Sequence, residues 1–83
     1  MARPLEENGK KNLISSRVAK LRKSRKWSQR ELALQLQLIG IDMDKNVITR
    51  IETNKRYVSD IELKALAKVF MVSYQYLIDG SEQ

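Results

Sequence analysis

Residues 28–52, SQRELALQLQLIGIDMDKNVITRIE, predict the centre of the fold, which is two short helices joined by a turn. Ser28 and Glu31 have the spacing of a capping box, in which each side chain satisfies a backbone N–H of the other at the start of a helix. The apolar residues of this helix recur at three- and four-residue intervals and are Leu32, Ala33 and Leu36. The apolar period breaks at Gly40, which indicates the turn.

A second helix is expected after the turn, with one apolar and one polar face. Asp44 can cap its start, so we expect the helix over about residues 44–53. The residues at inward helical spacing are Val47, Ile48 and Ile51. The polar face, which we expect to point outward, consists of Lys45, Asn46, Thr49 and Arg50. In a small basic protein, such a pair of helices is typical of a DNA-binding domain whose second helix lies in the major groove.

Length and composition indicate one small globular domain. A chain of 83 residues has no room for a second domain, and its stability must come from compact helix packing. Hydrophobic residues make up 42% of the chain and charged residues 31%, which is ordinary for a globular protein. The absence of cysteine excludes disulfides and thiolate metal sites. No signal peptide or membrane-spanning run is recognisable, so we expect a cytoplasmic protein associated with the nucleoid and not with a membrane.

The charge of the chain favours an anionic partner such as nucleic acid. The formal net charge is +6, and the isoelectric point is near 9.8. Residues 1–30 hold ten basic residues and only two acidic ones, so the N-terminal third carries the excess. The alternative interpretation is a solvated helix surface with surplus lysine, because runs of charge are often no more than that.

The remaining segments predict three further helices and no sheet. A helix is expected over about residues 13–26, where apolar residues share one face and no Gly or Pro interrupts. Ser59 with Glu62 forms a second capping box, which opens another helix. A last short helix begins at Ser73 and stops at Gly80. No segment shows sustained alternation with a period of two, so the fold class is all-α, a compact bundle of about five short helices.

Domain boundaries and the irregular segments follow from the same patterns. We expect a flexible N-terminal arm at residues 1–12, one domain at 13–80 and a tail at 81–83. Trp27 is expected to fill the core and not to stack on bases. The turn between the two central helices is apolar, which favours a loop packed on the core over a partner surface. Its apolar residues are Leu38, Ile39, Ile41 and Met43.

Three segments together resemble a known family. They are SSRVAKLRKSRKWSQRELA at 15–33, VITRIETNKRY at 47–57 and LKALAKVFMVSYQYLIDG at 63–80. In order and spacing they are similar to the phage-repressor type of helix-turn-helix domain, the XRE or Cro/C1 family. The resemblance implies a lambda-repressor-like fold and a sequence-specific regulator of transcription, in most cases a repressor of bacterial or phage origin. Its implied partner is double-stranded DNA with an inverted-repeat operator, bound by a homodimer.

The resemblance also implies roles for individual residues. Lys45, Asn46, Thr49 and Arg50 would face base edges, with Asn46 suited to adenine and Lys45 or Arg50 to guanine. Phosphate contacts are expected from the N-terminus of the helix that Ser28 caps, from the basic first helix and from the loop after residue 53. The residues expected to make these phosphate contacts are Gln29, Arg22, Lys23, Lys55 and Arg56. Arg22 and Glu52 match a structural ion pair that ties the first helix to the DNA-reading one.

The sequence departs from that family in two places. The segment at 37–43 adds about five residues to the usual tight turn, which leaves the docking angle open. Thr53 and Asn54 stand where Asn-Gly is common, a change that Asn tolerates because it can adopt a left-handed backbone conformation.

Other functions differ from DNA binding in the residues that they require. An antitoxin or a controller protein of the same fold stays open. A helical protein–protein interaction module would use exposed apolar residues, including Tyr74 and Tyr76. An enzyme is not expected, since the chain lacks His, Cys and a glycine-rich phosphate loop. We expect no cofactor and no metal, because Asp42 and Asp44 alone are a poor oxygen ligand set.

Overall fold

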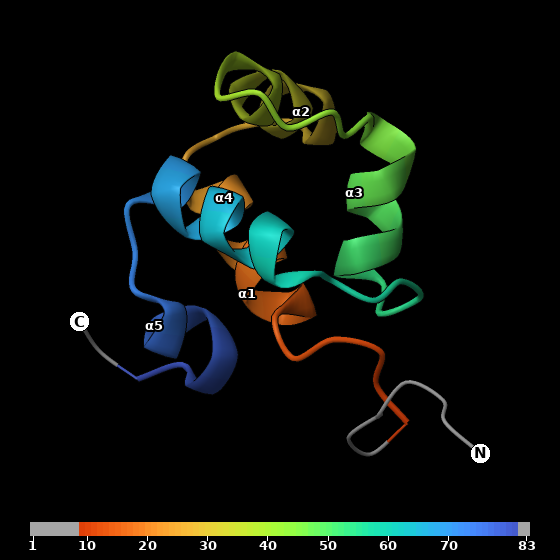
Figure 1. Cartoon of the computed structure of the whole chain (residues 1–83), viewed down its shortest axis with the longest axis vertical. Helices are drawn as coiled ribbons and strands as arrows, with labels where there is room; N and C mark the ends of the chain where they lie inside the picture. Colours follow the sequence, from red (N-terminus) through yellow and green to blue (C-terminus); the bar gives the residue numbers. More distant parts are fainter. Residues whose placement is uncertain (1–8, 82–83) are drawn as a thin grey trace.

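The computed structural model describes residues 9–81, which form five helices and no sheet (Figure 1). The helices are α1 (Ser15–Ser24), α2 (Gln29–Leu38), α3 (Lys45–Glu52), α4 (Asp60–Phe70) and α5 (Tyr74–Asp79). The all-α class and the five-helix bundle are therefore confirmed. The helix predicted at 13–26 is shorter at both ends than expected, and Lys26, just beyond it, has a positive φ of 58°.

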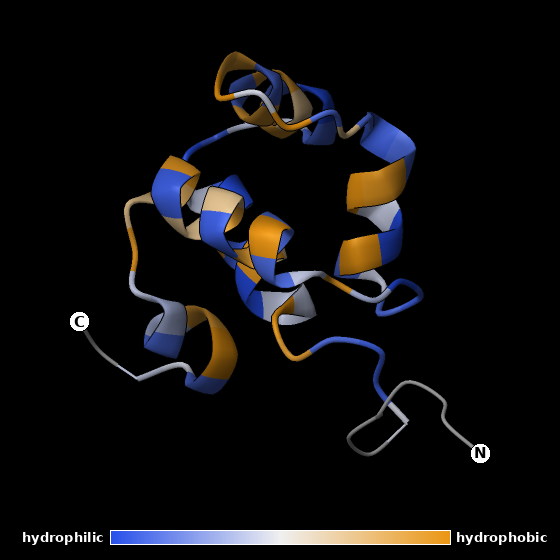
Figure 2. Cartoon of the chain, in the orientation of Figure 1, coloured by the Kyte–Doolittle hydropathy of each residue, from blue (hydrophilic) through white to orange (hydrophobic). Residues whose placement is uncertain are grey.

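One hydrophobic core holds the helices together. Figure 2 shows hydrophobic and hydrophilic residues alternating along the helices, as expected where one face of each helix is buried. The largest fully buried side chains are Phe70, Leu32, Leu36, Met43, Ile48, Ile51, Leu66, Leu77 and Val18, so every helix contributes. Each such side chain stabilises the fold by about 1.5–3 kcal/mol relative to exposure. Arg17 on α1 also holds α5, because its guanidinium donates to the backbone oxygens of Leu77 (3.0 Å) and Ile78 (2.9 Å).

The starts of α2, α3, α4 and α5 lie where the side-chain caps predict them. In α2 the Ser28 Oγ accepts from the Glu31 N–H at 3.0 Å, and the Glu31 carboxylate accepts from the Ser28 N–H at 2.8 Å. The capping box at the start of α4 has the same two hydrogen bonds. Asp44 caps α3 through the N–H of Val47, and Ser73 caps α5. These caps satisfy N–H groups that have no partner within the helix.

Two expectations about irregular segments need correction. Residues 1–8 and 82–83 of the predicted arm and tail lie outside the described residues. Asn12, however, is buried and hydrogen-bonded, so the folded domain begins before residue 13. The segment at 37–43 is only partly packed on the core: Met43 is buried and Ile41 packs against the core, whereas Ile39 and Leu38, the last residue of α2, are exposed.

Trp27 packs against the core as expected. Its ring stacks on Phe70 at a centroid distance of 5.9 Å with 28° between the planes. It fills the junction between α1 and α2 and fixes α4 against both.

Met71 ends α4 in the left-handed conformation, with φ 57° and ψ 46°. A left-handed backbone costs a residue with a Cβ about 1–2 kcal/mol, and glycine avoids this cost. The Met71 side chain is 82% exposed, so it contributes little burial in return. We therefore expect Met71→Gly to raise the free energy of unfolding by about 1 kcal/mol. Urea denaturation measures this change, and Met71→Ala, which keeps the strain, is the control. Equal stability of the two variants would contradict the explanation.

Candidate nucleic-acid interface

The outward face of α3 carries the four polar residues that the sequence placed there. Lys45, Asn46 and Arg50 are exposed, and Thr49 is half-buried between them. On the opposite side Ile48 and Ile51 are each 1% exposed and pack into the core. Since positions three and four apart on a helix share a side, Lys45 lies beside Thr49 and Asn46 beside both Thr49 and Arg50, and the four residues form one continuous polar face. This face is fixed to the domain because the opposite, apolar side of the helix packs into the core.

A hydrogen-bond network centred on Glu52 joins α1, α2 and α3. Its carboxylate accepts from Arg22 Nε at 2.7 Å, from Arg22 Nη2 at 3.0 Å and from Gln29 Nε2 at 3.1 Å. Arg22 also donates to the backbone oxygen of Trp27 at 2.9 Å. The hydrogen bonds to Glu52 raise the pKa of Arg22, although burial alone would lower it. The side chains of Arg22 and Glu52 are only 11% and 6% exposed, so this ion pair is largely desolvated.

Gln29 links this network to the polar face of α3. Its Oε1 accepts from Thr49 Oγ1 at 2.8 Å, and the same hydroxyl lies 3.0 Å from the backbone oxygen of Lys45. A hydroxyl has one proton, which is shared between these two acceptors. The Thr49 hydroxyl proton is therefore used within the protein, and its methyl group remains for an apolar contact. The start of α2 is thereby fixed in position and orientation against α3.

The five predicted phosphate contacts fall into two groups. Lys23 on α1 and Lys55 in the loop between α3 and α4 are exposed, and Gln29 lies at the N-terminus of α2. Arg22 and Arg56 bind carboxylates of the protein itself. The pair of Arg22 with Glu52 is the ion pair that the family resemblance implied and is confirmed, whereas the pair of Arg56 with Glu62 was not predicted. Phosphate binding by these two arginines stays a prediction. Their roles in this structure are to position α3 and the loop after it.

Arg56 forms a bidentate pair with Glu62, with both N–O distances at 2.9 Å. These hydrogen bonds lower the pKa of Glu62 against the opposing effect of burial, and the N–H of Ser59 lowers it further. They raise the pKa of Arg56. The loop that carries Lys55 is thus attached to the capping box of α4.

Low pH should weaken the pair between Arg56 and Glu62. Because the pKa of Glu62 is lower in the folded state than in the unfolded chain, the stabilisation is complete above the ordinary glutamate pKa. This stabilisation is lost as the pH falls through the lowered pKa of Glu62. We expect the free energy of unfolding to decrease between about pH 5 and pH 2, and to decrease less in Glu62→Gln, which has no charge to lose there. Urea denaturation across this range is the measurement; parallel curves for the two proteins would contradict the prediction.

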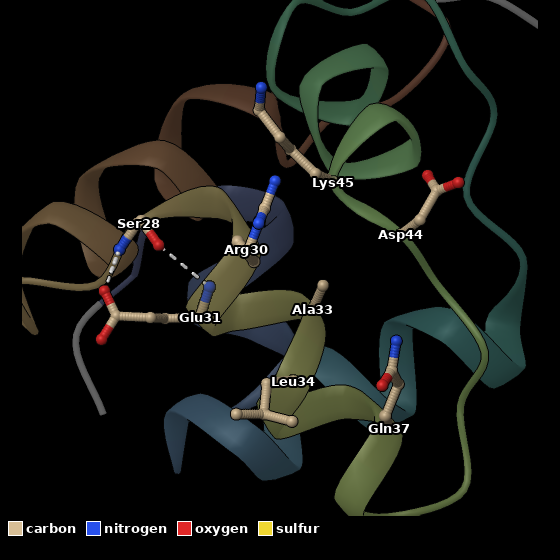
Figure 3. A pocket seen from close by; sticks show the side chains of 8 residues that line it. All are labelled: Ser28, Arg30, Glu31, Ala33, Leu34, Gln37, Asp44 and Lys45. Carbon is tan, nitrogen blue, oxygen red and sulfur yellow. Dashed lines mark hydrogen bonds between the residues drawn. The ribbon is translucent and has the colours of Figure 1, made fainter.

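An open hollow of about 580 Å³ lies between α2 and the start of α3 (Figure 3). Arg30 and Lys45 stand on the same side of it and point in the same direction. Arg30 is exposed and follows Gln29 in the first turn of α2. Arg30 is not among the site residues predicted from the sequence, although its position beside the capping box could have indicated it. With Arg30 included, cations lie at both the start of α2 and the start of α3.

No helix within residues 9–81 is long and apolar enough to span a bilayer. In the same part of the chain, no three His, Cys, Asp or Glu side chains are grouped so that they could hold a metal ion.

Comparison with known proteins gives one match. A sequence model of a protein family described as helix-turn-helix matches residues 18–77, which run from α1 into α5 and include the whole polar face of α3. No curated protein and no solved structure matches the chain.

Proposed function

Because this chain belongs to the helix-turn-helix family of the phage-repressor type, which binds DNA, we propose that it represses transcription by binding a specific duplex sequence. The observation that carries the proposal is the polar face of α3, held outward by Ile48 and Ile51 and fixed by the Glu52 network. In this proposal the protein is a regulator and not an enzyme, and it acts in the cytoplasm on nucleoid DNA.

α3 lies in the major groove in this proposal. Arg50 and Lys45 suit guanine, whose N7 and O6 are acceptors, and Asn46 suits adenine, which offers a donor and an acceptor. Each good bidentate contact discriminates against a wrong base by about 1–3 kcal/mol. Thr49 contributes its methyl group, which can contact the methyl group of thymine, because its hydroxyl proton is used by Gln29 and Lys45.

Phosphate contacts hold α3 in the groove. We assign them to Gln29, Arg30, Lys23 and Lys55, which surround α3 on three segments of the chain. Gln29 has a second amide proton on Nε2 beyond the one that it donates to Glu52. Because the network already orients this side chain, binding a phosphate through it costs little further conformational entropy.

Two copies are proposed to bind an inverted repeat. One domain of this size covers a half-site, and the two half-sites of such an operator lie about one helical turn apart. Ile61 on α4 is 68% exposed and Tyr74 on α5 is 51% exposed, and both line a hollow of about 430 Å³. We assign this apolar surface to the contact between the copies.

Selection of bound fragments from a random pool of duplex DNA tests the proposal. The proposal predicts enrichment of one motif with two-fold symmetry, and affinity that falls steeply as salt rises. A motif without symmetry would contradict binding as a dimer but would still support DNA binding. If no sequence is enriched and the protein does not bind DNA even in low salt, the proposed DNA-binding function is wrong. The exposed apolar residues would then favour a protein partner.

A further inference from the structure

The side chain of Asn54 holds the segment that precedes α1. Its Oδ1 accepts from the backbone N–H groups of Lys11 and Asn12, both at 3.0 Å. Its Nδ2 donates to the Ser15 hydroxyl at 3.3 Å. The backbone of Asn54 has φ 64°, a conformation that glycine adopts at less cost. Backbone geometry alone therefore does not explain an asparagine here, whereas these three hydrogen bonds do.

Asn12 completes this connection from the other side. It is 8% exposed, and its Nδ2 donates to the backbone oxygens of Ile51 (3.1 Å) and Arg56 (2.9 Å). Its Oδ1 accepts from the Ile14 N–H at 3.1 Å. Residues 11 and 12 are therefore attached to the end of α3 and to the loop that follows it.

This attachment brings lysines together at the C-terminal end of α3. Lys10 and Lys11 are exposed, as is Lys55, which directly follows Asn54. The Lys11 ammonium lies 5.6 Å from the centre of the Tyr57 ring in the same loop. Figure 1 shows the segment before α1 passing beside this loop, next to the end of α3.

We propose that Asn54 positions Lys10 and Lys11 as a phosphate-binding pair at the C-terminal end of α3, an inference that rests on the proposed function. The C-terminus of a helix carries a partial negative charge, which disfavours a nearby phosphate. The positive charges of Lys10, Lys11 and Lys55 outweigh this partial negative charge near the end of α3. The start of α2, whose Gln29 contacts Thr49 and Glu52, and this lysine group then bind phosphates on two segments beside the DNA-reading helix, so that its angle in the groove is fixed.

Salt dependence of DNA binding tests the lysine pair. The probe is a duplex of about 30 base pairs taken from the selected pool, long enough for two half-sites. We expect the double variant Lys10→Gln/Lys11→Gln to flatten the plot of log K against log salt by about 0.9 for each phosphate that the variant no longer binds. The matched control is Lys20→Gln/Lys68→Gln, which removes the same charge from exposed positions of α1 and α4 that are assigned neither to DNA nor to the contact between the copies. Equal slopes for the two double variants would overturn the proposal.

A double-mutant cycle tests the part assigned to Asn54. Asn54→Gly retains a residue that accepts the left-handed backbone but loses the acceptor for residues 11 and 12. We expect the lysine substitutions to change the salt slope much less in this background than in the natural one. An undiminished effect would show that Asn54 does not position the lysines. If the natural protein itself fails to bind duplex DNA, the proposed function fails first and this inference with it.

Discussion

Replacing Glu52 with alanine is expected to lower the free energy of unfolding by about 3–5 kcal/mol, as for other broken buried pairs. The substitution leaves the Arg22 guanidinium, whose side chain is 11% exposed, without its carboxylate. It also removes the acceptor of Gln29 Nε2. An unpaired charge in this position costs much more than the intact pair contributes, because desolvation is no longer offset.

Urea denaturation of three proteins measures this effect and identifies its cause. Besides Glu52→Ala, the set contains the natural protein and the double variant Arg22→Leu/Glu52→Leu. The double variant removes both charges, so we expect it to regain most of the stability that Glu52→Ala loses. If the double variant is less stable than Glu52→Ala, the loss comes from the hydrogen bonds and packing of the two side chains, and the unpaired-charge explanation is wrong.

Arg50→Ala is expected to weaken binding to the selected duplex by about 1–3 kcal/mol, which is roughly 5- to 150-fold. Arg50 is exposed on the polar face of α3, so its loss should leave the stability of the fold nearly unchanged. Binding to an unrelated duplex should fall much less, since base contacts carry specificity whereas phosphate contacts do not. Asn46→Ala should behave in the same way.

Titration measures the affinity of each variant for the selected duplex and for the unrelated one. Lys68→Ala is the control, because it removes an exposed charge from α4, away from the polar face. Equal losses on the selected and the unrelated duplex would assign Arg50 to a phosphate in place of a base edge.

The sequence predicts those parts of the fold that depend on neighbouring residues. The capping boxes of α2 and α4, the Asp44 cap and the left-handed Asn54 each depend on residues within three positions of one another. The inward positions of α3 follow from helical periodicity in the same way. Such features are independent of how distant segments meet, so the order and the starts of the helices could be predicted.

The features that escaped prediction depend on contacts between distant segments. Asn12 and Asn54 are 42 residues apart, and nothing in the local pattern of either indicates the other. The pair of Arg56 with Glu62 spans only six residues, but it was missed as well, because it depends on how the chain turns into α4 and not on a local pattern. Ile61 has the spacing of a packed residue in α4, yet it is 68% exposed.

Backbone amide shifts during titration with the selected duplex show whether the polar face of α3 meets DNA. We expect the largest NMR chemical-shift changes in Lys45–Glu52 and at the start of α2, with further changes at residues 10–12 and 54–55. Unchanged amides throughout α3, with the shifts confined to α4 and α5, would contradict it.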